Sequence, residues 1–196
     1  MIMTKTHEDA LYKIIGIDPG THRLGFSLLT FNLVNYDITL LMSETIKLEK
    51  DSLYNPFIEE VHGARYARLQ GLKKRLLLLL KDYQPHSVIC EGSFSGKFAE
   101  AFQCGIECQL TIRETLMEYD LTLPLELVDA PTVKKTVGVN GKSHDKEDIR
   151  VAIKALSDLN NPNKVNYNLL DSHALDAIAV GYYKTQSLLT LMTQSS

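Results

Sequence analysis

Four side chains that can bind a metal ion are spread along the 196-residue chain: Asp18, Glu91, His173 and Asp176. Asp18 and Glu91 each close a short apolar run, as expected at the end of a buried strand. His173 and Asp176 are three residues apart in a helix-like stretch, so they share one helix face. Because an unpaired buried charge is costly, the two strand-end acids need a partner. The pattern predicts a divalent metal site.

The types of these side chains indicate which metal and which reaction to expect. Three carboxylates and one imidazole suit Mg²⁺, with Mn²⁺ as a substitute, better than Zn²⁺. Two such ions about 4 Å apart can activate water and stabilise the leaving oxygen of a phosphodiester. His173 follows the expected helix cap Asp171, where the helix dipole disfavours an imidazolium, so we expect a neutral, metal-binding imidazole. The set favours a nuclease.

Hydrophobic patterns predict the elements that must position these residues. Strands are expected at 12–17, 24–30, 38–48, 87–91 and 123–128, and helices at 58–83, 97–119, 130–137, 145–157 and from Asp171 to about Thr185. The first three strands, joined by turns, should form an antiparallel meander, and the later strands alternate with helices. The predicted fold class is therefore α/β, with a five-stranded mixed sheet flanked by helices on both faces.

This topology predicts that the acids converge. If the helix at 58–83 is a crossover, the strands ending at Asp18 and Glu91 are parallel neighbours. Their carboxyl ends then lie side by side, which is where open α/β sheets place ligands. Two carboxylates at that edge would repel each other unless a cation lay between them.

The length, composition and charge of the chain indicate its domain organisation and its cellular location. We expect a flexible leader at 1–11, a single domain at 12–186 and a polar tail at 187–196. No apolar stretch reaches membrane-spanning length, no signal peptide is evident, and three cysteines make no disulfide framework, so we expect no membrane partner and a cytoplasmic protein. The net charge of −3 is unusual for a nucleic-acid binder, although the distribution of charge matters more than its sum.

Several motifs in order resemble one family. The run from Ile15 to Gly20, followed by Gly25, resembles the opening of RuvC, the Holliday-junction resolvase family of the RNase H-like superfamily. Residues 89–94 resemble the family's second acidic strand, 133–138 its basic segment and 173–179 its last metal motif. The resemblance spans 14–180. The stretch at 31–56 is longer, and the net charge less basic, than is usual in the family, which fits a diverged, phage-type member. We therefore expect the protein in a bacterial or phage-infected cell.

The resemblance implies an RNase H-like nuclease domain and a function. The expected activity is that of a Mg²⁺-dependent crossover junction endodeoxyribonuclease acting in DNA recombination and repair. It would resolve four-way and other branched DNA by paired hydrolysis that leaves 5′-phosphates. The resemblance also implies a homodimer, with the helix at 97–119 on its surface. His173 would be a metal ligand or would position the attacking water.

The resemblance also implies DNA contacts. Phe94 matches an aromatic that inserts at the crossover, and we favour this role over the alternative of a satellite core residue. The candidate backbone contacts are Lys97, Lys134, Lys135, Lys142 and Lys146. Lys134 and Lys146 would contact the scissile strand, whereas the plain alternative for each lysine is a solvated surface charge.

Three alternatives remain open at this stage. The first is a nuclease of the YqgF group that acts on structured RNA, and the second is a junction-binding module without catalysis. The third is a sugar-kinase or actin-like ATPase, because Asp18-Pro19-Gly20-Thr21 also matches a phosphate loop. The chain is too short for the two lobes of such an ATPase and has no second Asp-x-Gly loop.

Overall fold

The computed structural model describes residues 10–93, 99–141 and 145–194. Six strands form one mixed sheet in the order β5-β4-β1-β2-β3-β6. The strands are β1 (Leu11–Asp18), β2 (Arg23–Asn32), β3 (Ile38–Lys47), β4 (Ser87–Glu91), β5 (Leu125–Val128) and β6 (Leu159–Asn160). The helices are η2 (Leu48–Lys50), α1 (Pro56–His62), α2 (Ala64–Tyr83), α3 (Ala99–Tyr119), α4 (Ala130–Thr136), α5 (Lys146–Ala155) and α6 (Ser172–Gln194).

Strand β1 lies at the centre of the sheet because its residues 14–17 are apolar or glycine and are fully covered. It pairs antiparallel with β2 and parallel with β4, with Ile17 opposite Cys90. The predicted parallel pairing of the two acid-ending strands is therefore confirmed. Asp18 and Glu91 come directly after Ile17 and Cys90, so both lie where these two neighbouring strands end.

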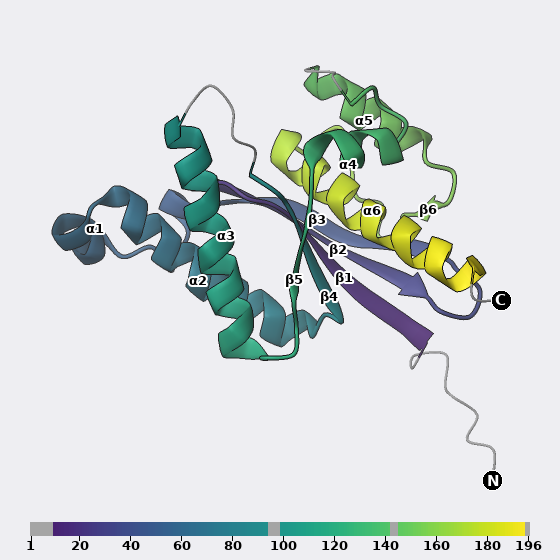
Figure 1. Ribbon diagram of the computed structural model, residues 1–196. Coiled ribbons are helices and arrows are strands. Elements are labelled where there is room, and N and C mark those ends of the chain that lie inside the picture. The colour runs from purple at the N-terminus through teal and green to yellow at the C-terminus, as the bar shows by residue number, and fades with distance from the viewer. Residues whose placement is uncertain (1–9, 94–98, 142–144, 195–196) are drawn as a thin grey trace, which may run out of the picture.

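Helices cover both faces of the sheet, as predicted (Figure 1). Helices α2 and α3 bury residues such as Leu72, Leu76 and Ile112 against one face. Helices α4, α5 and α6 bury Val133, Ile149 and their neighbours against the other face. The sheet thus separates two apolar cores, and the mixed α/β class with two helical layers is confirmed.

Two elements differ from the sequence-based expectation. The sheet has a sixth strand, β6, which is only two residues long and pairs parallel with β3. The helix expected at 58–83 is broken into α1 and α2 at Gly63, which has a φ of 88°. That conformation is accessible to glycine at low cost, so the glycine ends one helix where the apolar pattern continued.

Helix α6 is longer than expected. It continues past Thr185 to Gln194, so most of the expected polar tail is helical. Leu188, Leu189 and Met192 pack against the second core and explain the extension. At the other end, Ala10 is buried and Leu11 begins β1, while residues 1–9 of the expected leader lie outside the described part. No helix in the described ranges is long and apolar enough to span a membrane.

Candidate active site

Helix α6 approaches the sheet closely because glycines face it. A Cβ atom at Gly16 would lie 2.4 Å from the Ala177 carbonyl oxygen, and one at Gly25 would lie 2.1 Å from the His173 carbonyl oxygen. The buried Ser27 hydroxyl donates a hydrogen bond of 2.7 Å to the Ala177 carbonyl. These contacts hold the first turns of α6 directly on β1 and β2.

The N-terminus of α6 is fixed by Asp171. The Ala174 amide donates to its carboxylate over 3.2 Å, which is the predicted capping contact. The hydroxyl of Thr45, on β3, donates to the same carboxylate oxygen, and the Arg23 guanidinium lies 3.7 Å from the other oxygen. Asp171 is therefore a structural cap that ties α6 to the sheet.

His173 and Asp18 meet, although they are 155 residues apart. The imidazole Nδ1–H donates to Asp18 Oδ2 over 2.6 Å. This hydrogen bond raises the pKa of His173 above its usual value, against the opposing effect of burial, and the carboxylates of Asp171 and Asp176 act in the same direction as Asp18. The nearby acids therefore act on the imidazole in the opposite direction to the helix dipole, on which the expectation of a neutral ring rested.

Glu91 lies in the same group of acids. The pKa of its carboxyl is raised to about 7, first by burial and then by the negative charges of Asp18 and Asp176, while Lys134 opposes the shift. These interactions show that the two strand ends and the first turns of α6 converge on one place. The result is a partly buried, anionic cluster with a lysine near it.

The donor set suits Mg²⁺ or Mn²⁺, since carboxylate oxygens dominate it and the acids repel one another. Among the described residues, however, no three His, Cys, Asp or Glu side chains are arranged as a ready-made metal-binding group. One donor pair is already engaged, because His173 bonds Asp18. The chemistry of the residues fits a divalent cation, and binding would have to exchange that hydrogen bond for metal contacts.

Sequence reasoning missed a buried amide that supports Glu91. Gln109, on α3, donates through Nε2 to the Ser93 hydroxyl at 2.8 Å and to the Glu91 carbonyl oxygen at 3.4 Å. Gly105, one turn earlier, leaves room for Ser93, because a Cβ there would lie 2.1 Å from its hydroxyl oxygen. The only sequence signal was a polar residue on the apolar face of a helix.

The predicted DNA contacts fall in three groups. Lys134 lies on α4, near enough to Glu91 to lower its pKa, and Lys135 is exposed on the same helix. Phe94, Lys97 and Lys142 lie outside the described residues.

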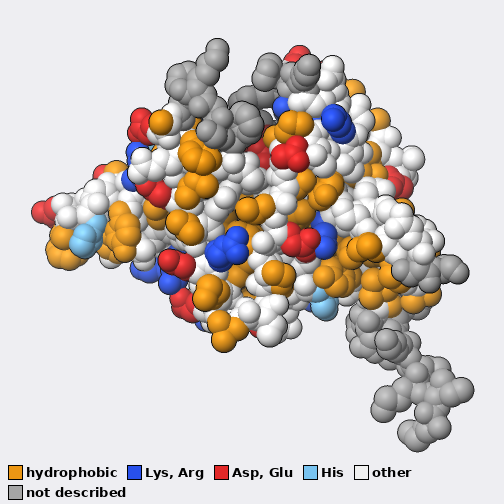
Figure 2. All heavy atoms as spheres, viewed as in Figure 1, with side chains coloured by type: hydrophobic (Ala, Val, Ile, Leu, Met, Phe, Trp, Pro, Cys, Tyr) orange, Lys and Arg blue, Asp and Glu red, His pale blue; other side chains and the backbone are white. Residues whose placement is uncertain are grey.

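Lys146 begins α5, but its side chain is outside the described part. On the face seen in Figure 2, basic side chains are scattered among acidic and apolar ones and form no continuous stripe. This distribution agrees with the modest net charge of −3.

Comparisons with known proteins place the fold. The sequence matches no family model and no curated protein. The structure resembles Thermus thermophilus RuvC in complex with a Holliday junction substrate, with a TM-score of 0.66 and 18% identity over 90% of this chain and 96% of that one.

Two further resolvases show the same likeness. The yeast mitochondrial Holliday junction resolvase has a TM-score of 0.62 and 13% identity over 94% of this chain and 85% of that one. The fowlpox virus resolvase, solved with Holliday junction DNA, has a TM-score of 0.54 and 15% identity over 90% of this chain and 99% of that one. The predicted RuvC-like, RNase H-like fold is confirmed.

Proposed function

We propose that the protein is a Mg²⁺-dependent, structure-specific endodeoxyribonuclease that resolves four-way and other branched DNA. The observation that carries the proposal is the convergence of Asp18, Glu91, His173 and Asp176 at one edge of the sheet. This convergence occurs in a fold that is similar to solved junction resolvases over most of the chain. The sequence motifs that resemble RuvC contain these four residues.

Each residue has a role in this proposal. Asp18, Glu91 and Asp176 would hold the metal, and His173 would either join them or orient the attacking water. Bound divalent ions would activate water and stabilise the leaving oxygen of the phosphodiester. Lys134 lies near Glu91, where it can contact a phosphate of the strand being cut. Lys146 is the candidate for a second phosphate contact.

Paired cutting of a four-way junction requires two active sites, so we also propose a homodimer with α3 on its surface. In support, α3 leaves Leu110 54% exposed and Met117 56% exposed. Equilibrium sedimentation of the purified protein would test this: a dimer mass is expected, and Leu110→Glu should shift it toward the monomer.

The cleavage assay uses a labelled four-way junction with Mg²⁺ or Mn²⁺. We expect paired nicks that leave 5′-phosphates. Asp18→Asn should lower the rate by about 1,000-fold or more, because the loss of one metal-holding carboxylate removes several kcal/mol of transition-state stabilisation. The matched control is Asp120→Asn, which makes the same change at an exposed turn after α3 and should cut like the wild type.

The same samples distinguish the alternatives. Binding of the uncut junction is measured by gel shift with Ca²⁺ in place of Mg²⁺. A protein that binds the junction but never cuts it would be a binding module, and one that cuts only structured RNA would be an RNA nuclease. Either result would overturn the proposal.

A further inference from the structure

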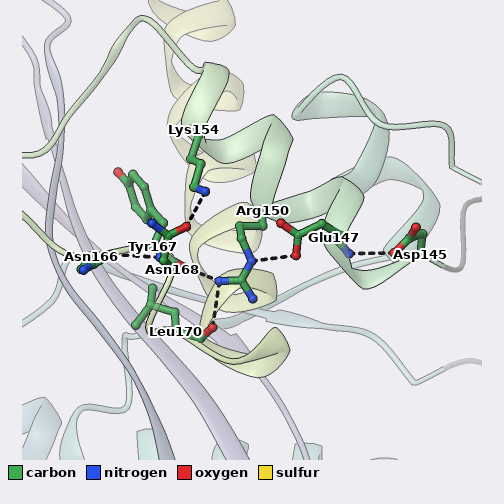
Figure 3. Close-up of polar contacts among 8 residues, drawn as sticks. All are labelled: Asp145, Glu147, Arg150, Lys154, Asn166, Tyr167, Asn168 and Leu170. Carbon is green, nitrogen blue, oxygen red and sulfur yellow. Dashed lines mark hydrogen bonds and ion pairs between the residues drawn. The ribbon is translucent and has the colours of Figure 1, made fainter.

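The segment that leads into α6 is held by helix α5. Arg150 donates through one terminal nitrogen to the carbonyl oxygens of Tyr167 and Leu170, the latter at 3.1 Å. Lys154, one turn later on α5, donates to the Asn168 side chain over 2.6 Å. Figure 3 shows these bonds converging from α5 on the residues 166–170. The segment has no strand or helix of its own to fix its path.

The guanidinium of Arg150 is itself fixed. Its Nε donates to Glu147 over 2.9 Å, and the Glu147 amide donates to the helix cap Asp145 over 2.9 Å (Figure 3). The Arg150 side chain is only 18% exposed. A planar guanidinium with several donors can bond a carboxylate and two carbonyls together, which a lysine ammonium cannot do in the same geometry.

The bond to Leu170 lies one residue before the cap of α6. Asp171 follows Leu170, and His173 is in the first turn that Asp171 caps. On the opposite side, the Thr45 hydroxyl holds Asp171. The start of α6 is therefore held between α5 and the sheet, and its position determines whether the His173 ring reaches Asp18.

We propose that Arg150 is a positioning residue, which sets the start of α6 and thereby holds His173 against Asp18. Arg150 does not touch the substrate in this proposal. The role in cleavage rests on the proposed function, whereas the placement of the His173 ring can be measured without it.

The test compares three variants of the full chain. Arg150→Gln removes the bonds to both carbonyls, and Arg150→Lys retains the charge but loses the planar fork. Lys154→Gln is the matched control, because it removes a bond from the same helix to the same segment without reaching Leu170. Thermal melting measures folding, and junction cleavage gives kcat and KM. Proton–nitrogen correlation spectra of the His173 ring, recorded without metal at one pH, report its contact with Asp18.

We expect Arg150→Gln to lower kcat by about 10-fold with KM little changed, since small misplacement of a reacting group costs rate more than binding. The His173 ring signals should move toward those of a solvated histidine. Arg150→Lys should give a smaller change in the same direction, and Lys154→Gln should leave the ring signals and kcat as in the wild type. If Arg150→Gln fails to fold, the ring signals of Arg150→Lys decide.

Unchanged ring signals and kcat in the folded Arg150 variants would overturn the inference, as would an equal change in Lys154→Gln. If the wild type cuts no junction, the proposed function fails, and the ring signals alone decide whether Arg150 positions His173. The two failures are therefore distinguishable.

Discussion

At the scale of single residues, the candidate site holds protons more tightly than its side chains would in water. The pKa of Glu91 is raised to about 7 by burial and then by Asp18 and Asp176. The pKa of His173 is raised by its hydrogen bond to Asp18. The carboxylate of Asp18 contributes to both shifts, although burial is the larger cause for Glu91. A divalent cation would reverse the effect on Glu91 by favouring its ionised form.

The first prediction concerns pH and the metal-free protein. A raised folded-state pKa contributes stability at low pH that is lost as the pH rises through it. For Glu91 the loss falls between its ordinary value of 4.5 and about 7, and for His173 it falls above 6.5. We expect the melting temperature without metal to fall between pH 5.5 and 8, and Glu91→Gln to weaken this fall. Mg²⁺ should restore stability at pH 8. A wild-type profile parallel to that of Glu91→Gln would contradict the prediction.

The second prediction concerns the buried amide of Gln109. Gln109→Leu removes the donor to Ser93 and to the Glu91 carbonyl, and a lost buried hydrogen bond costs about 1–3 kcal/mol. Denaturant unfolding should show that loss, and hydrogen exchange at residues 91–93 should become faster. Gln103→Leu changes the same side chain on the exposed face of α3 and should have little effect. Equal exchange in both variants would argue against the support of Glu91 by α3.

At the scale of elements, the site depends on how closely α6 lies on β2. Gly25→Ala places a methyl group 2.1 Å from the His173 carbonyl oxygen, so the helix must move. We expect destabilisation of about 1–3 kcal/mol, as for other overpacked contacts, and loss of junction cleavage. Gly71→Ala is the control, since its new Cβ meets nothing closer than 3.9 Å and alanine favours a helix. A Gly25→Ala variant that unfolds at the wild-type denaturant concentration would refute the close approach.

The sequence predicted most of the elements and the meeting of Asp18 with Glu91, because both depend on local apolar patterns and simple topology. Strand β6 escaped prediction, since two residues carry no periodicity and their pairing with β3 arises only in the folded chain. The end of α6 escaped because the sequence-based expectation places a polar tail after Thr185, although Leu188, Leu189 and Met192 pack against the core.

Within the site, the sequence could place the ligand candidates but not their partners. The supporting contacts of Gln109 and Arg150 join segments that are distant in the chain, so no spacing rule reveals them. The raised pKa of His173 was not foreseen for a similar reason, because it depends on carboxylates that other elements bring to the ring.

At the scale of the whole molecule, one sheet separates two cores, and α6 belongs to both the candidate site and the second core. Its first turns carry His173 and Asp176, and its last turns pack Leu188, Leu189 and Met192. Packing of the C-terminal turns of α6 therefore helps to hold its N-terminal turns, which carry the candidate ligands, in place.

The fourth prediction follows from this double role. A chain that ends at Ser187 loses three partly buried apolar side chains and should be destabilised by roughly 3 kcal/mol. Chemical denaturation should show the loss, and junction cleavage should fall at temperatures near the new midpoint. A chain that ends at Met192 removes only the exposed Thr193 and Gln194 from the described part of α6 and should match the full chain. Identical midpoints for both truncations would show that the last turns do not matter.

The distance of 155 residues between Asp18 and His173 also has a consequence during translation. A nascent chain whose C-terminal segment is still inside the ribosome has its first strands available for folding but lacks two of the four candidate ligands. The site can assemble only after the first turns of α6 have emerged, so under the proposed function a product that stops before His173 would be unable to cut DNA.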